Sequence, residues 1–185
     1  FYHFDEQQKL VYRFDYYTAD QVPLAYFAFG RDLVELDDQH LLITAIDGLY
    51  IYARREKKLT KLKAGDYPLL DGFLDYPTTF YRFFQAKRGS MVVTKMNSDS
   101  IFHINIPGNR KTISKVPFVF TKDEVHWRSR LAAANDSVFY ITGHISGFYK
   151  MQLNQQTGAI RIFPEKYFKT SLCYGLLTDR DNNLW

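Results

Sequence analysis

A short run of oxygen-bearing side chains near residue 180 is the first candidate for chemistry. Asp179, Asp181 and Asn183 alternate along the chain as the first ligands of a calcium-binding loop do. Such a loop also needs a glycine at its sixth position, which is Leu184 here, and a later glutamate, which the given sequence lacks. We therefore interpret this segment as a polar turn between two strands, and we expect neither a metal ion nor a cofactor.

Residue types that serve as nucleophiles or metal ligands are scattered along the chain. The histidines show no ligand spacing: His3, His40, His103, His126 and His144. The single cysteine, Cys173, cannot form an intrachain disulfide, and we interpret it as a small packing residue beside Tyr174. Ten dispersed glycines provide neither a phosphate-binding loop nor a nucleophile elbow. We assign no catalytic residue and expect this region not to be an enzyme.

Aromatic side chains make up an unusually large part of the sequence. There are 16 Phe, 14 Tyr and 2 Trp, together 17% of the 185 residues. Rings at this density suit pleated, half-buried strands better than helix bundles, so the composition predicts a strand-rich fold. The apolar content of 46% is typical of a globular protein. The sequence contains no run of 18 apolar residues, the length that a membrane-spanning helix needs.

The net charge of +4 comes with one dense basic run, residues 54–58, followed by Lys61 and Lys63. Nucleic-acid binding would need a recognisable module around such a run, and none is present. We interpret the run as the solvated end of a hairpin. The modest positive balance weakly favours an anionic ligand.

A repeat of 46 to 52 residues organises the whole chain. Four apolar anchors each follow a polar turn, with spacings of 50, 48 and 46 residues: Leu41, Met91, Phe139 and Trp185. A threonine follows three residues after the first three anchors: Thr44, Thr94 and Thr142. A second series of aromatic-rich segments has spacings of 48, 52 and 47 residues and begins at Phe1, Leu49, Ile101 and Phe148. Two series with the same period indicate repeated structural units.

Each period contains four short predicted strands. The first strands cover 33–36, 81–85, 130–133 and 175–178, the second carry the anchors, the third are the aromatic segments, and the fourth cover 9–14, 59–63, 112–116 and 159–163. Four antiparallel strands in about 40–50 residues are typical of a β-propeller blade. A sandwich would lack so regular a period, and a β-helix has shorter coils. We expect second strands to be covered on both faces, whereas outer strands should alternate, as at Tyr50 and Tyr52.

The predicted fold is therefore all-β, a β-propeller of four-stranded antiparallel blades, with about four blades present as part of a larger ring. Residues 1–185 form one propeller fragment. Its expected parts are a partial blade at 1–16, blades at about 24–63, 73–116 and 124–163, and the start of a further blade at 171–185.

The segment 179–185 resembles the two-component regulator propeller repeat. That pattern runs Asp, two residues, Gly, Asn, Leu, Trp, Ile, Gly, Thr, and its fixed positions are occupied here by Asp179, Asn183, Leu184 and Trp185. Asn182 replaces the turn glycine, and asparagine tolerates a positive φ better than most residues. Residues 46–52 resemble the strand that follows in the family, while Met91 and Phe139 stand where the pattern has tryptophan.

The resemblance implies a ring of about seven blades in the periplasmic input region of a hybrid two-component sensor histidine kinase of Bacteroidetes type. Many of these sensors detect glycan fragments. We therefore expect a periplasmic or extracellular ligand-recognition propeller of a membrane-anchored sensor that responds to an oligosaccharide. The alternatives are a structural or protein–protein interaction propeller and, ranked lower, a propeller lyase or glycosidase. Expected partners are the remaining blades and downstream domains, with no nucleic acid and no membrane contact in this segment; a homodimer stays open.

A sugar site in such a fold would use rings to stack on sugar faces and polar side chains to bind hydroxyls. Propeller ligands usually meet the face where the loops before the first strands and after the second strands converge. The first group of candidates lies at or just before first strands: Arg31, Tyr81, Trp127, Arg128 and Tyr174. The second group follows second strands: Asp47, Asn97 and His144. We predict that these eight residues bind the ligand.

Overall fold

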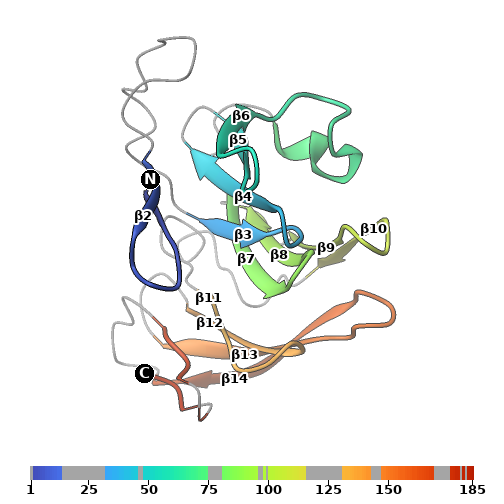
Figure 1. The fold of residues 1–185 in the computed structure, drawn as a ribbon. Helices are drawn as coiled ribbons and strands as arrows, with labels where there is room; N and C mark the ends of the chain where they lie inside the picture. Colours follow the sequence, from blue (N-terminus) through green and yellow to red (C-terminus); the bar gives the residue numbers. More distant parts are fainter. Residues whose placement is uncertain are drawn as a thin grey trace.

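The computed structural model describes residues 2–13, 32–45, 48–74, 81–95, 98, 100–115, 131–142, 147–168, 176–179, 181 and 183–185 (Figure 1). Within these ranges the chain forms fourteen strands and one short 3-10 helix, and every strand pair is antiparallel. The predicted all-β class is confirmed. None of the helical structure in these ranges is long and apolar enough to span a membrane.

The strands form one hairpin and three four-stranded sheets. The hairpin contains β1 (Tyr2–Phe4) and β2 (Leu10–Arg13). Sheet 1 contains β3 (Leu33–Glu35), β4 (His40–Ala45), β5 (Gly48–Ala53) and β6 (Lys58–Lys61). Sheet 2 contains β7 (Tyr81–Lys87), β8 (Ser90–Lys95), β9 (Ser100–Asn105) and β10 (Arg110–Lys115). Sheet 3 contains β11 (Leu131–Ala133), β12 (Val138–Thr142), β13 (Phe148–Leu153) and β14 (Ile160–Tyr167). Strands follow one another across each sheet in chain order.

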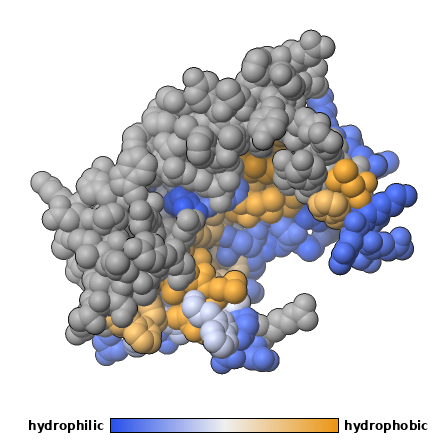
Figure 2. Space-filling model, turned by 90° about the vertical axis from the view of Figure 1, so that its left-hand side faces the viewer, coloured by the Kyte–Doolittle hydropathy of each residue, from blue (hydrophilic) through white to orange (hydrophobic). Residues whose placement is uncertain are grey.

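The second strand of each sheet lies in the middle of the apolar core. Leu42 packs in one cluster with Met91 and Val93 of sheet 2, while Val92 packs in another with Phe139 of sheet 3. All five side chains are fully buried. Alternate residues of β8 therefore contact opposite neighbouring sheets, which confirms the prediction that its two faces are covered. On the side shown in Figure 2, hydrophobic residues form a band with hydrophilic residues on its outer side.

Three of the four predicted anchors are equivalent in the pairing register. Leu41, Met91 and Phe139 lie opposite the corresponding residues of the first strands, Glu35, Gln85 and Ala133. The local pattern of turn, apolar residue and threonine therefore aligned these three repeats correctly.

The segment of the fourth anchor pairs in the same antiparallel way. Leu184 forms the bridge to Thr178, whose hydroxyl donates to the carbonyl of Ala133 in sheet 3, and Trp185 exchanges two backbone hydrogen bonds with Leu177. Gln85 binds the backbone of Glu35 in the same way between sheets 1 and 2. Trp185 is 73% exposed, unlike the three buried anchors, and its equivalence to them stays a prediction.

The turns before the first and fourth anchors are closed by similar hydrogen bonds. The Asp37 carboxylate accepts a hydrogen bond from the amide of His40, three residues later. The Asp179 carboxylate instead accepts one from the amide of Asn183, four residues later, and also from the Trp185 indole. The segment at Asp179 is therefore a polar turn, as predicted.

The third strand of sheet 1 is more buried than predicted. Leu49 belongs to the cluster shared with sheet 2, whereas Tyr50 and Tyr52 pack with Leu41 and Ile43 on the other face. All three of these side chains are buried. From Tyr50 to Ala53 the expected alternation is present as buried tyrosines and half-buried neighbours, whereas the preceding Leu49 is buried as well.

A 3-10 helix, η2 (Pro68–Phe73), joins sheet 1 to sheet 2. Proline at its start suits a helix because the first turn has no use for the missing amide hydrogen. The fully buried Phe73 ring meets the edges of Tyr81, Phe83 and Phe102 at centroid distances of 5.1, 5.7 and 5.2 Å. The helix therefore fixes Tyr81 at the beginning of sheet 2.

Candidate functional site

The first strands of the three sheets lie beside one another, with β7 next to both β3 and β11 (Figure 1). Asp32 directly precedes β3, and Arg82 is the second residue of β7. Two different sheets therefore contribute oppositely charged side chains to one end of this strand group. This is also the end at which the sequence predicts ligand binding.

Asp32 and Arg82 form a bidentate ion pair. Arg82 Nη2 lies 2.6 Å from Asp32 Oδ1, and Arg82 Nε lies 3.0 and 3.1 Å from the two carboxylate oxygens. The amide of Phe83 donates to Asp32 Oδ2 at 2.9 Å. The Asp32 and Arg82 side chains are only 5% and 14% exposed, so each charge depends on the other for compensation.

The threonine of the repeat holds Asp32 in place. The amide of Asp32 donates to Thr44 Oγ1 at 2.9 Å, and the amide of Thr44 donates to the Asp32 carbonyl at 3.0 Å. Thr94 occupies the same position in sheet 2 and pairs with Arg82. Both threonines are buried. The threonine at the end of the second strand thus lies opposite one member of the ion pair in each sheet.

Tyr81 is the predicted ligand residue that falls among the described residues. It begins β7, is half-buried, and lies with Lys95 Nζ 5.6 Å from its ring centroid. Phe73 also contacts the Tyr81 ring, in a T-shaped arrangement with a centroid distance of 5.1 Å. A partly exposed ring beside a cation can stack on the apolar face of a sugar while the ammonium group binds an oxygen.

The other predicted ligand residues lie outside the described residues: Arg31, Asp47, Asn97, Trp127, Arg128, His144 and Tyr174. They remain predictions. The structure places Tyr81 in a group with Asp32, Arg82 and Lys95, three residues that the sequence analysis did not select.

A signal for the missed ion pair was present in the sequence. Asp32 and Arg82 are 50 residues apart, which equals the spacing between the anchors Leu41 and Met91. They therefore occupy the same position in successive repeats and carry opposite charges. Searching equivalent repeat positions for complementary charges would have found them.

A second ionic network joins sheets 1 and 2 at the other end of the first strands. Arg54 Nη2 donates to Glu35 at 2.7 Å, and Arg88 lies 3.6 Å from the same carboxylate. Arg88 also pairs with Asp38. The hydrogen bond from Arg54 is the largest influence on Glu35 and holds its pKa below the usual value. This network ties the turn of sheet 1 to the turn of sheet 2.

One serine–histidine hydrogen bond superficially resembles catalytic machinery. Ser90 Oγ lies 2.8 Å from His103 Nε2, and both residues are fully buried. Burial lowers the pKa of His103 to about 4, with the charges of Arg110 and Lys87 adding to the effect. A neutral imidazole sealed between two sheets is out of a substrate's reach, so we assign it to packing. Within the described ranges, no three His, Cys, Asp or Glu residues are grouped to hold a metal ion.

Comparison with known proteins finds similarity at the level of structure. No protein-family model and no curated protein matches the sequence. Two solved structures of the extracellular domain of BT4673 from B. thetaiotaomicron resemble this chain, one provisionally assigned to a one-component system and the other to a hybrid two-component system. The first has a TM-score of 0.52 and 18% identity and covers 84% of this chain and 19% of that chain. The second has a TM-score of 0.50 and 12% identity and covers 94% and 20%.

This chain therefore spans about a fifth of the length of the structures that it resembles. At these identities the likeness shows a shared fold.

Proposed function

We propose that the three sheets are consecutive blades of a β-propeller, and that the chain is part of the extracellular or periplasmic input region of a two-component sensor that responds to a glycan. The observation that carries this proposal is the way in which neighbouring sheets meet. Contacts between them join residues that are one repeat apart in the sequence.

This relation holds along both sheet junctions. Between sheets 1 and 2 the separation is 50 residues for Asp32–Arg82, Glu35–Gln85 and Asp38–Arg88. Between sheets 2 and 3 it is 46 residues for Thr112–Gly158 and Ser114–Ile160. Ala133 and Thr178, at the next junction, are 45 residues apart. Blades arranged around an axis place equivalent residues side by side, whereas a sandwich of two sheets has no reason to keep that phase.

The sensory part of the proposal has two supports. The extracellular domains that share the fold belong to proteins assigned to signalling systems. The segment 179–185 independently resembles the repeat of two-component regulators. The kinase and regulator parts would then lie elsewhere in the protein, and this region would bind and transmit without turnover.

A glycan is the proposed ligand because Tyr81 and Lys95 combine a partly exposed ring with a cation at the end of the first strands. The Asp32–Arg82 pair and the Phe73 ring hold that end rigid before a ligand arrives. Preorganisation of this kind lowers the entropic cost of binding. Trp127 and Arg128 are the further ligand residues that we propose on the same face.

Calorimetric titration of the purified protein with neutral oligosaccharides tests the proposal. Tyr81→Ala should weaken binding about tenfold, since stacking on an aromatic ring contributes roughly 1 kcal/mol. Trp127→Ala and Arg128→Ala together should abolish binding, while Tyr50→Phe, a change within the buried core, should leave it intact. Turnover of an oligosaccharide would assign the protein to the enzymes. Absence of binding across the panel would favour the structural or protein–protein interaction propeller.

A further inference from the structure

The positive charge of this protein is concentrated in one short segment. Residues 54–63, called the basic hairpin below, contain six Lys or Arg residues and one Glu, a net charge of +5. Because the whole chain carries +4, all the remaining residues together carry −1. The basic hairpin comprises the turn after β5, strand β6 and the two residues that follow β6. The hairpin end predicted from the sequence is therefore confirmed. The net charge of residues 54–63 exceeds that of all the other residues together.

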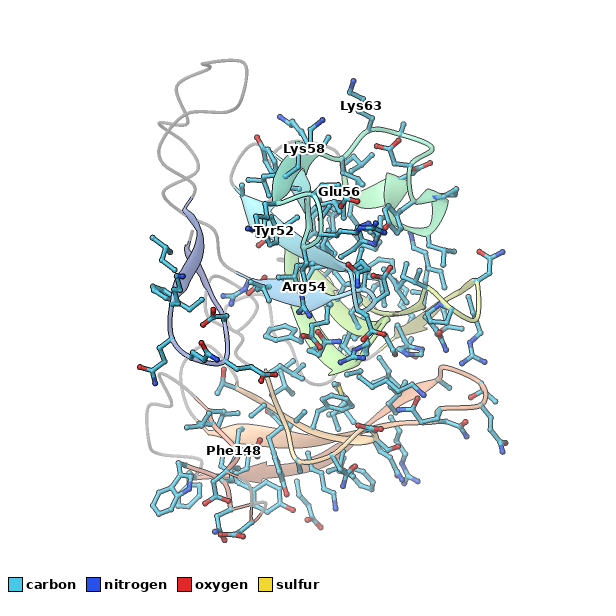
Figure 3. All side chains as sticks on the ribbon, in the orientation of Figure 1. Tyr52, Arg54, Glu56, Lys58, Lys63 and Phe148 are labelled. Carbon is cyan, nitrogen blue, oxygen red and sulfur yellow. The ribbon has the colours of Figure 1, made fainter. Side chains whose placement is uncertain are left out.

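Most of these cations are available to a partner. Arg55, Lys57, Lys58 and Lys63 are exposed, and none of them forms an ion pair with a carboxylate of the described residues. Arg54 differs, since it is bound to Glu35. Figure 3 shows the labelled Lys58 and Lys63 side chains directed away from the body of sheet 1.

The backbone of the turn presents one lysine in an unfavourable conformation. The four turns between third and fourth strands each contain one residue with positive φ, namely Gln8 (60°), Lys57 (52°), Asn109 (43°) and Gly158 (75°). Asparagine and glycine are the usual choices at such a position, and other residues are disfavoured by roughly 1 kcal/mol. Lysine at this position in the basic hairpin therefore suggests that its charge has a use.

The composition of the basic hairpin narrows the kind of partner. It contains no aromatic residue that could stack on nucleic-acid bases. Its two leucines, Leu59 and Leu62, are half-buried and buried, so no exposed apolar side chain is available to enter a membrane or form the centre of a protein interface. The contacts that the basic hairpin offers to a partner are therefore its ammonium and guanidinium groups, which follow the outer edge strand of sheet 1.

We propose that the basic hairpin binds an extended anionic polysaccharide through its carboxylate or sulfate groups, on a surface separate from the Tyr81 face. The choice of a carbohydrate over other flexible polyanions rests on the proposed function. Lys57, Lys58 and Lys63 provide the contacts. Lys58 and Lys63 are five positions apart and can be separated by up to roughly 17 Å, which lets distant charged units of one polysaccharide chain engage separate cations. Lys57 and Lys58 lie at the end of sheet 1 away from Asp32, so the acidic chain would bind apart from the Tyr81 face of the same molecule.

Binding of polygalacturonate to the purified protein, measured at low salt and at about 0.15 M salt, tests this inference. The wild type should bind at low salt and lose affinity steeply as salt rises. Lys57→Glu with Lys58→Glu should weaken binding more than tenfold. The matched control is Lys9→Glu with Lys87→Glu, which changes the net charge equally at two other exposed lysines and should alter binding less than threefold. Equal losses in the two variants would overturn the proposal.

Two further arms separate the inference from its alternatives. Lys57→Gly should weaken binding about threefold while the melting temperature stays the same or rises, a combination that a purely structural lysine would not produce. Poly-glutamate or vesicles of anionic lipid that bind as tightly as polygalacturonate would show that the carbohydrate assignment is wrong. We expect the double variant Lys57→Glu with Lys58→Glu to bind neutral oligosaccharides as the wild type does. A loss of polygalacturonate binding in this variant would then test the basic hairpin alone and not the proposed site at Tyr81.

Discussion

Replacing Arg82 with methionine should destabilise the protein by about 3–5 kcal/mol, which is the usual cost of removing one partner from a buried ion pair. The change keeps most of the apolar stem of the side chain and removes the three contacts to Asp32, between 2.6 and 3.1 Å long. The Asp32 carboxylate, 5% exposed, would keep only the amide of Phe83 as a donor within the junction. A carboxylate left without its counter-charge in a low-dielectric site is far less stable than the original pair.

Urea unfolding of the purified protein, followed by circular dichroism, measures this cost. Arg55→Met is the matched control, because Arg55 is exposed and unpaired among the described residues and should change stability by less than about 0.5 kcal/mol. The double variant Asp32→Asn with Arg82→Met should lose clearly less than the sum of the two single variants, since neither charge is then stranded. A loss below about 1 kcal/mol for Arg82→Met, with additive single effects, would refute the buried ion pair as a lock between sheets 1 and 2.

Two further predictions concern the junction between sheets 2 and 3. Burial lowers the pKa of His103 to about 4 in the folded protein, against an ordinary value of 6.5, so the unfolded chain binds more protons between pH 4 and pH 6.5. The free energy of unfolding should therefore be constant just above pH 6.5 and fall by about 3 kcal/mol as the pH drops to 4. In urea unfolding measured at a series of pH values, His103→Gln should reduce this pH dependence. Gly158→Ala should cost about 2 kcal/mol, because a Cβ there would lie 2.6 Å from Thr112 Oγ1 and 2.8 Å from His103 Nδ1 at a φ of +75°. Gly65→Ala, also at positive φ but with no atom within 4 Å of the new Cβ, should cost about 1 kcal/mol; equal losses would mean that the junction does not press on Gly158.

Strand positions and their repetition could be predicted because they depend on local properties. Leu41, Met91 and Phe139 each stand after a polar turn and within a short apolar run, and the structure places them at equivalent pairing positions. The equivalence of Trp185 to these anchors stays a prediction. The carboxylate of Asp179 accepts from the amide four residues later, whereas that of Asp37 accepts from the amide three residues later, and a spacing pattern does not contain such hydrogen bonds.

The candidate site was predictable only in part for a related reason. Tyr81 was selected because its residue type and its place before a strand suit ligand binding, and the structure puts its half-buried ring beside Lys95. The pairing of Asp32 with Arg82 was missed, although a 50-residue separation signalled it, because reading one repeat at a time does not compare equivalent positions.

The all-β class, the period of the repeat, the turns and most strand positions of this protein can be predicted from the sequence alone. Turn formation and β-propensity depend on only a few neighbouring residues. The folded arrangement was needed to learn which residues of successive repeats touch. The burial of Met91 and Val92 on opposite faces of one strand, the isolation of the imidazole of His103 and the ion pair between Asp32 and Arg82 all arise when one sheet covers the next. Such contacts join residues about 50 positions apart, and their energy depends on burial and mutual distance, which no local pattern specifies.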